Sequence, residues 1–383
     1  MHKLLAMPGS DLVPPFCPRQ GCVHHGVPER TDWFESDGHH ETAAFGSVPR
    51  FRCKACGRSF STQTFSVDYY AKKVVDYREL ELLLSSSMSG RSLGRHFLLS
   101  PNSVQNRVDR LSRQALAVHS ALRGFANPAE PVVVDGFQSL DRSQYFPNNI
   151  TLSVSSGSLF LLEATHATLR RSGAMTEVQK RRREAMESKI NYEPHALARS
   201  FTEILDQLAK ERPPGPTRPL VLVTDLKKEY THAFDRHAFG SLAKDQVKRV
   251  LVSSRSARTR SNPLFPVNYW DRELRKDQAA HRRETACHCR SAANGMARFW
   301  CYARYHNYRK RYPIRAHRVD QRTHADVAGI RKELRLALDG LYYRARAFLS
   351  RSELSVAGLK AWLKLFPTPG VDGIGRIPAF ALD

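Results

Sequence analysis

The sequence predicts an α/β protein in which a mixed β-sheet with helices follows a small cysteine-rich module and a helical segment. Its 383 residues are long enough for about two or three domains, and 41% of them are hydrophobic, so we expect at least one sizeable core. Two close cysteine pairs lie in an N-terminal segment with little apolar periodicity. Farther on, three strand-like runs precede alternating helical and strand-like runs, an order typical of a mixed sheet with helices on its faces.

The N-terminal module spans residues 13–66, which are rich in Cys, His, Gly and Pro. Such a segment cannot bury enough apolar surface to fold on its own, so we expect a bound metal to stabilise it. Four residues separate Cys17 from Cys22, and two separate Cys53 from Cys56. Two such pairs supply four thiolates for a closed, tetrahedral, structural zinc site. The alternatives are a histidine in place of one cysteine ligand, or four unrelated thiols. The histidines between the two pairs are His24, His25, His39 and His40.

Residues 70–126 carry helical periodicity and predict a helix-turn-helix between Met88 and Leu111. The first helix covers 91–97, Ser100 caps the second helix, and Pro101 takes its first position. The second helix, residues 102–111, would enter the major groove of DNA; the alternative is an ordinary helical hairpin. The side chains that this helix would leave free to meet DNA are Asn102, Ser103, Gln105, Asn106 and Arg107.

The mixed sheet is predicted for residues 131–320. The expected strands are Val132–Val134, Ile150–Val154, Leu159–Ala164, Leu220–Val223 and Val247–Val252, with helices over Pro194–Lys210 and Tyr230–Phe239. A basic insertion at residues 168–192 contains Lys180, Arg181, Arg182 and Arg183. This insertion would either hold DNA phosphates or form a solvated helix face. Residues 321–383 predict a helical C-terminal region with an irregular tail.

The composition points to a polyanionic partner. The formal net charge is +23, from 60 Lys and Arg against 37 Asp and Glu, and such an excess supplies phosphate contacts with nucleic acid. An inert basic surface is the alternative. We expect no membrane span, because no run approaches the roughly 20 apolar residues that one needs, and no secretory signal at the N-terminus. Seven cysteines, four of them in metal-type spacing, favour a reducing compartment, which we expect to be the cytoplasm and its nucleoid.

Two aspartates end or follow predicted strands. Asp135 comes directly after Val132–Val134, and Asp225 follows the run that begins at Leu220. Carboxylates on neighbouring strands can share divalent ions such as Mg²⁺ or Mn²⁺ together with substrate phosphate. For a single aspartate after a strand the alternative is a turn or cap residue. A third acid is expected from a helix after the fifth strand, and the candidates are Asp271, Glu273 and Glu284.

These features together resemble the transposases of bacterial insertion sequences that have an RNase H-like catalytic domain. The resemblance covers roughly residues 15–312 and rests on the zinc-ribbon stretch Arg50–Ser61, the helix-turn-helix and the acidic triad. It implies that Asp135 and Asp225 are the first two acids. The family often shows Asn, two residues and then an acid, which gives Asn268 and Asp271 here. The third acid is Asp rather than the commoner Glu, so Glu284 stays open as the ligand.

The stretch Tyr302–Lys310 resembles the aromatic and basic helix that follows the triad in this group. We expect it to face DNA with Arg304, Arg309 and Lys310; the alternative is a helix that only packs on the core. The resemblance implies metal-dependent cleavage and transfer of DNA strands at transposon ends, by a homo-oligomer bound to its DNA. The alternatives are a catalytically inactive DNA-binding regulator and an RNase H-like nuclease without strand transfer.

Overall fold

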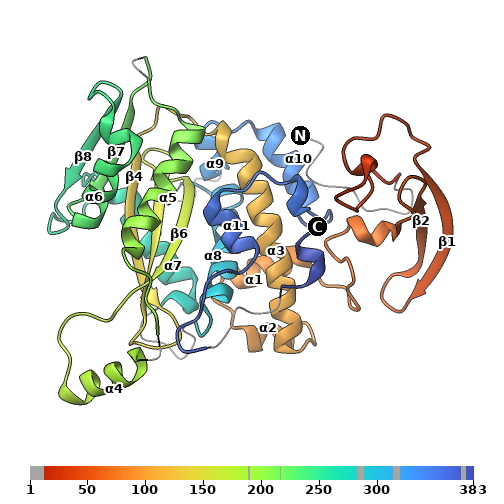
Figure 1. Ribbon diagram of the computed structural model, residues 1–383, viewed down its shortest axis with the longest axis horizontal. Coiled ribbons are helices and arrows are strands. Elements are labelled where there is room, and N and C mark those ends of the chain that lie inside the picture. Colours follow the sequence, from red (N-terminus) through yellow and green to blue (C-terminus); the bar gives the residue numbers. More distant parts are fainter. Residues whose placement is uncertain (1–12, 189, 216, 283–288, 314–319, 372–376) are drawn as a thin grey trace.

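The computed structural model describes residues 13–188, 190–215, 217–282, 289–313, 320–371 and 377–383. Along the long axis of the molecule, a small N-terminal sheet, a central group of helices and a larger sheet follow one another (Figure 1). The small sheet is antiparallel and consists of β1 (Phe34–Thr42), β2 (Gly46–Cys53) and β3 (Ser59–Ser61). Short 3₁₀ turns lie at Val23–His25, Thr62–Phe65, Arg123–Phe125, Ala238–Ser241, Ala279–His281, Leu349–Arg351 and Ala379–Ala381.

The central helices come from both ends of the chain. They are α1 (Tyr77–Ser85), α2 (Gly90–His96), α3 (Pro101–Leu122), α8 (Ala292–Tyr308), α9 (His324–Val327), α10 (Lys332–Tyr342) and α11 (Val356–Trp362). Ser100 caps α3 as predicted, and Pro101 is its first residue. The helix continues to Leu122, well past the predicted end at Leu111, because its second half is buried against α8, α10 and α11.

The larger sheet contains β4 (Val132–Leu140), β5 (Pro147–Ser155), β6 (Leu161–Thr168), β7 (Leu220–Asp225) and β8 (Val247–Val252) in the order β6-β5-β4-β7-β8. Its helices are α4 (Glu177–Glu187), α5 (Ala196–Glu211), α6 (Lys228–Arg236) and α7 (Phe265–Asp277). The first three strands form an antiparallel meander with short connections, whereas β7 and β8 run parallel to β4 after helical crossovers. The prediction of an α/β protein with a mixed sheet is therefore confirmed.

The first strand of this sheet is longer than expected. We predicted that it ends at Val134, but β4 pairs with β5 without interruption from Val132 to Leu140. Asp135 therefore lies inside the strand rather than directly after it. Pairing with β5 before, at and after Asp135 fixes its backbone.

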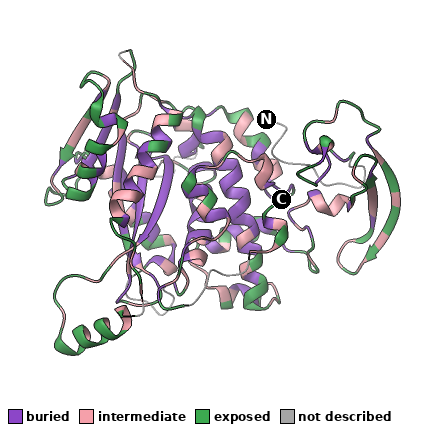
Figure 2. Ribbon diagram, in the orientation of Figure 1, coloured by how far each residue is buried: buried purple, intermediate pink, exposed green. Residues whose placement is uncertain are grey.

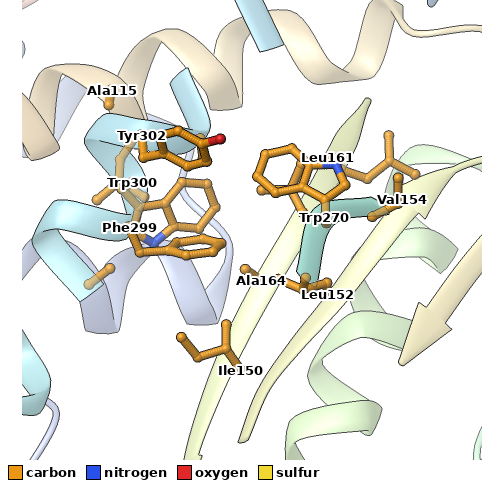
Figure 3. Packing of buried hydrophobic residues seen from close by; sticks show 14 of the residues in the cluster. Ala115, Ile150, Leu152, Val154, Leu161, Ala164, Trp270, Phe299, Trp300 and Tyr302 are labelled. Carbon is orange, nitrogen blue, oxygen red and sulfur yellow. The ribbon is translucent and has the colours of Figure 1, made fainter. Parts of the chain in front are cut away.

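Both faces of the larger sheet are covered by helices, as the buried strands in Figure 2 show. On one face, Leu152 and Val154 of β5 lie near Trp270 of α7 (Figure 3). On the other face, the Thr151 hydroxyl hydrogen-bonds the Ser200 hydroxyl of α5 at 3.1 Å. Because neighbouring residues of a strand point to opposite faces, this alternation assigns α7 and α5 to opposite sides of the sheet.

Helix α4 stands away from the rest of the molecule (Figure 1). No residue of α4 is buried, so this helix contributes nothing to the core. Within the described residues, we find no helix with the length and apolar character that crossing a bilayer requires.

Candidate carboxylate site and cysteine cluster

Asp135 and Asp225 occupy matching positions on two adjacent parallel strands. The last residue pair between β4 and β7 joins Val134 to Thr224, so the two aspartates come one step beyond it on each strand. Asp135 lies opposite Leu152 of β5, and residues paired across strands point to the same face. Since Leu152 faces α7, the Asp135 side chain points toward that helix as well.

Lys227 joins the two carboxylates. Its Nζ lies 2.6 Å from Asp135 Oδ1 and 2.9 Å from Asp225 Oδ2, while its backbone N–H donates to Asp225 Oδ1. Burial by itself would lower the pKa of the Lys227 ammonium, but Tyr230 and the two carboxylates outweigh that effect and raise it. Lys227 is therefore a fixed positive charge between the aspartates at neutral pH.

Asp271 approaches the same place from α7. Trp270, the residue before it, is fully buried and donates its indole N–H to the Leu159 carbonyl at 2.9 Å, which fixes this part of the helix. Burial, and secondly the negative charge of Asp135, raise the pKa of Asp271 to about 7. Its buried Oδ1 has no hydrogen-bond partner among the described residues. A buried carboxylate oxygen without a partner is costly unless a proton or a cation satisfies it.

The other candidates for the third acid differ from Asp271. Glu273 is buried among cations and forms ion pairs with Lys276, at 2.7 Å, and with Lys310. These pairs lower its pKa despite burial. Two residues along a helix point in nearly opposite directions, so Glu273 cannot share the environment of Asp271. Glu284 lies outside the described residues.

The four cysteines gather as a tight cluster. Their Sγ atoms all lie within 4.8 Å of one another, with 3.6 Å between Cys17 and Cys56 and 3.7 Å between Cys22 and Cys53. A tetrahedral zinc ion with Zn–S bonds of about 2.3 Å needs thiolates about 3.8 Å apart. The cluster could therefore hold a metal such as zinc. In the part of the chain that the structure describes, no other group of three or more His, Cys, Asp or Glu ligand atoms is as close.

Local geometry explains why these cysteines meet. Cys53 ends β2, and Gly57, with φ of +67°, closes the turn that carries Cys56 back toward it. The His25 ring is engaged elsewhere, because its Nδ1 lies 2.8 Å from the Cys17 carbonyl and its Nε2 lies 2.9 Å from the Ser350 hydroxyl. These contacts leave His25 no free nitrogen for a metal.

The same contacts dock the module on the C-terminal region. The rings of Phe16 and Phe348 meet edge to face at 5.1 Å, and the Arg351 guanidinium lies 3.8 Å from the centre of the Phe16 ring. The prediction from sequence treated residues 321–383 as a separate region. In the structure, part of this C-terminal region packs directly against the cysteine module.

Arg107 is not free to meet DNA, contrary to our expectation. It is buried, and its guanidinium lies 3.0 Å from Asp68 Oδ1 and 3.1 Å from the Tyr77 hydroxyl, and it also contacts the Lys73 carbonyl. The other residues predicted for this surface are exposed or partly exposed, namely Asn102, Ser103, Gln105 and Asn106.

The basic residues at the end of α8 are also engaged inside the protein. Arg304 is buried and pairs with Glu81 of α1 at 2.8 Å, so the expectation that it faces DNA is wrong. Arg309 shares Glu81 at 3.1 Å. Lys310 pairs with Glu273 and, at 3.1 Å, with Asp277. An ion pair to a residue more than 200 positions away leaves no local pattern in the sequence.

The basic insertion, in contrast, is open to solvent. Arg181 and Arg182 on α4 are exposed, Lys180 pairs with Glu177 at 2.6 Å, and Arg183 lies 3.8 Å from Glu187. Two further cations near the carboxylates were not predicted. Lys227 follows Asp225 by two residues, an ordinary position for a surface lysine, and Arg258 is close enough to act on the pKa of Asp271.

Comparison of the chain with protein-family models and with curated proteins finds no match.

Proposed function

We propose that this protein is a DNA transposase of an insertion sequence, with an RNase H-like catalytic domain that cleaves and joins DNA strands with the help of divalent metal ions. The observation that carries the proposal is that Asp135 inside β4 and Asp225 at the end of β7 share the Lys227 ammonium, while Asp271 on α7 is close enough to Asp135 for its pKa to respond to that charge. The supporting topology is a sheet in which a three-stranded antiparallel meander is extended by two parallel strands.

The acids fit divalent cations on two counts. Asp135 and Asp225 already hold one cation between them, the Lys227 ammonium. The buried Asp271 Oδ1 has no partner among the described residues, and burial, followed by the negative charge of Asp135, raises the pKa of Asp271 to about 7. Mg²⁺ and Mn²⁺ prefer carboxylate oxygens combined with water and substrate phosphate.

Each residue then has a separate task. Asp135 and Asp225, on rigid strands, would hold the metal, and the Asp271 carboxylate would join them from α7. Bound metal would supply charge stabilisation at the phosphoryl oxygens and activation of the attacking hydroxyl. Lys227, displaced from the carboxylates, would be left to neutralise phosphate charge. No side chain needs to form a covalent bond with DNA.

The DNA-binding parts of the proposal lie outside this site. The pair α2 and α3 would act as a helix-turn-helix that presents Asn102, Ser103, Gln105 and Asn106 to the major groove. The exposed Arg181 and Arg182 of α4 would contact backbone phosphates. The four-cysteine module would carry structural zinc. Cutting two transposon ends together would require more than one copy of the chain.

The test is a strand-cleavage and strand-transfer assay with Mg²⁺ or Mn²⁺ on labelled duplexes taken from the DNA that flanks the coding sequence. Asp135→Asn and Asp225→Asn should each abolish cleavage and joining while DNA binding is retained. Glu229→Gln, which alters an exposed acid on α6, is the matched control and should keep full activity. Full activity in both aspartate variants would contradict the assignment.

One observation favours a second candidate, a DNA-binding regulator without catalysis: Lys227 already neutralises two of the three acids. A regulator of this kind would bind the duplex and yield no metal-dependent product. A nuclease of the same fold would yield cleaved DNA without a joined product. The assay separates all three, because binding, cleavage and joining are scored on the same labelled strands.

A further inference from the structure

A cleft of about 900 Å³ lies between the cysteine module and the C-terminal segment. Its walls combine the turn that carries Cys56, one face of β2 and β3, and the stretch around Tyr69 and Tyr70. The arginines, the histidine and the aspartate that line it are Arg19, His40, Arg50, Arg58, Arg346 and Asp383. Four arginines against one acidic side chain make this a positively charged cleft.

Two of the four arginines form ion pairs within the protein, and the other two do not. Arg50 pairs with Asp37, at 3.3 Å, and Arg346 lies 3.4 Å from Asp383. The Arg19 and Arg58 side chains are exposed, and neither forms an ion pair with any residue that the structure describes. Uncompensated arginines that line a concave surface suit an anion with several charges, such as a nucleic-acid backbone.

An aromatic side chain stands at the same cleft. Tyr70 is 65% exposed, and its ring stacks on Phe380 with centroids 6.1 Å apart and planes 24° apart. Its φ of 54° is in the left-handed region, which costs free energy for a bulky residue and is found mainly where the surroundings impose it. Tyr69 supports this arrangement by meeting Phe380 edge to face at 4.9 Å. One face of the Tyr70 ring is thus backed by protein, and no ring of a residue that the structure describes is stacked on the opposite face.

His40 adds a polar group without a partner. Its buried Nδ1 makes no hydrogen bond to any described residue, although His40 lines the cleft.

We propose that this cleft binds unpaired DNA nucleotides, with Arg19 and Arg58 on the phosphates and one base stacked on Tyr70. Stacking on an aromatic side chain requires that the base leave its own helical stack, so the site favours single-stranded over duplex DNA. The inference rests on the proposed function only in taking DNA as the partner. It uses no carboxylate and no catalytic metal.

The experiment measures fluorescence anisotropy of a labelled ten-nucleotide oligo(dT) strand and of a ten-base-pair duplex with the zinc-loaded full chain, in buffer without Mg²⁺. Tyr70→Leu, which keeps an apolar cover over Phe380, should weaken single-strand binding roughly tenfold, since one base–aromatic stack is worth about that much. Tyr70→Phe should bind like the unaltered protein. Arg58→Glu should weaken binding at least as much as Tyr70→Leu.

Lys248→Glu is the matched charge control, because Lys248 is exposed on the edge strand β8 at the far end of the molecule. It should have little effect. The proposal is overturned if Tyr70→Leu binds the strand as well as the unaltered protein, if Lys248→Glu weakens strand binding as much as Arg58→Glu, or if Tyr70→Leu weakens duplex binding as much as strand binding. Zinc content and circular dichroism verify that each variant folds.

A second measurement locates the base. A strand with a single 5-iodouracil should cross-link to Tyr70 on irradiation, and the cross-linked peptide is identified by mass spectrometry. Cross-links confined to other parts of the chain would contradict the inference. Asp135→Asn should give the same binding and cross-linking, so a failure of the catalytic proposal leaves this test unaffected.

Discussion

The Lys227 ammonium lies 2.6 Å from Asp135 Oδ1, which makes the protein's own cation a competitor of any divalent metal at this site. Lys227→Met should therefore raise the affinity of the DNA-free protein for Mn²⁺ about tenfold, equivalent to about 1.4 kcal/mol. Without metal the variant should be less stable, because Asp135 and Asp225 are left without a counter-charge.

Titration calorimetry with Mn²⁺ measures the affinity, and the rise of the melting temperature on addition of Mn²⁺ gives an independent reading. Lys228→Met is the matched control, since Lys228 is exposed and adjacent in sequence. A loss of Mn²⁺ affinity in Lys227→Met would show that the lysine supports metal binding instead of competing with it.

Asp271 should destabilise the metal-free protein at neutral pH and above. Its pKa rises from the ordinary 3.8 to about 7 on folding, so between these values the folded chain holds a proton that the unfolded chain has lost. Stability therefore falls as pH rises through this window, and the cost is complete above pH 7. Asp271→Asn should stabilise the metal-free protein by roughly 2 kcal/mol at pH 8, allowing for a side chain that is only partly buried.

The measurement for Asp271→Asn is urea unfolding at pH 5 and pH 8. The gain should shrink at pH 5, where the unaltered Asp271 is mostly protonated in the folded state. Asp245→Asn, an exposed acid, should show no such pH-dependent gain. An equal effect of Asp271→Asn at both pH values would rule out the titration as its cause.

The order of strands and helices was readable from the sequence because buried strands appear as apolar runs and helices as periodic ones. The start of the third helix was readable too, since Ser100 and Pro101 are local signals. The far end of β4 was not, because Asp135 and Gly136 interrupt the apolar run and only pairing with β5 carries the strand on to Leu140.

The candidate site was predictable only in part. Asp135, Asp225 and Asp271 were found because each belongs to a recognisable element. Lys227 was missed, since nothing in the sequence shows that a lysine two residues after Asp225 turns back toward β4. Arg304 was wrongly assigned to DNA because the sequence does not show that its partner is Glu81 on α1. Such a pairing depends on the tertiary structure alone.

We predict that the four cysteines hold zinc, and that removal of this zinc unfolds the N-terminal module but leaves the larger sheet folded. Its core is small and includes Trp33, which is buried and stacked on Phe60 at 5.7 Å. A chelator should therefore shift Trp33 fluorescence to longer wavelength, and Cys53→Ser should do the same without chelator.

Elemental analysis should give one zinc per chain and none in Cys53→Ser. Trp33→Phe removes the reporter, so the chelator should leave its fluorescence from the remaining tryptophans unchanged. Cys289→Ser, a buried thiol outside the cluster, is the control for loss of a cysteine and should keep its zinc. Full zinc content in Cys53→Ser would contradict the four-cysteine site.

Buried histidines should make the protein sensitive to mild acid. Burial lowers the pKa of His119 from 6.5 to about 3, and the neutral ring lies 2.9 Å from both the Tyr308 hydroxyl and the Leu162 carbonyl. Below pH 6.5 the unfolded chain binds a proton that the folded chain does not, so stability falls as pH falls. Each such histidine contributes up to about 1.4 kcal/mol per pH unit.

Urea unfolding between pH 7.5 and pH 5 measures this slope. His119→Gln should be less stable at pH 7.5, yet lose stability less steeply on acidification. His232→Gln changes an exposed histidine and should keep the slope of the unaltered protein. An unchanged slope in His119→Gln would show that this histidine is not protonated on unfolding in that range.

Arg107 and Asn102 lie on the same helix, but substitutions at the two positions should have different effects on stability and on DNA binding. Arg107 is buried against Asp68 and Tyr77, so Arg107→Gln should lower the free energy of unfolding by about 2–4 kcal/mol, since removing one partner of a buried pair leaves the other without its counter-charge. Asn102 is exposed in the first turn of α3, and Asn102→Ala should leave stability unchanged. On the proposed function it should weaken binding to specific duplex DNA about tenfold, because one base contact is worth roughly 1–3 kcal/mol. Urea unfolding and duplex anisotropy on both variants measure these effects, and a DNA-binding loss in a fully stable Arg107→Gln would contradict the structural role of Arg107.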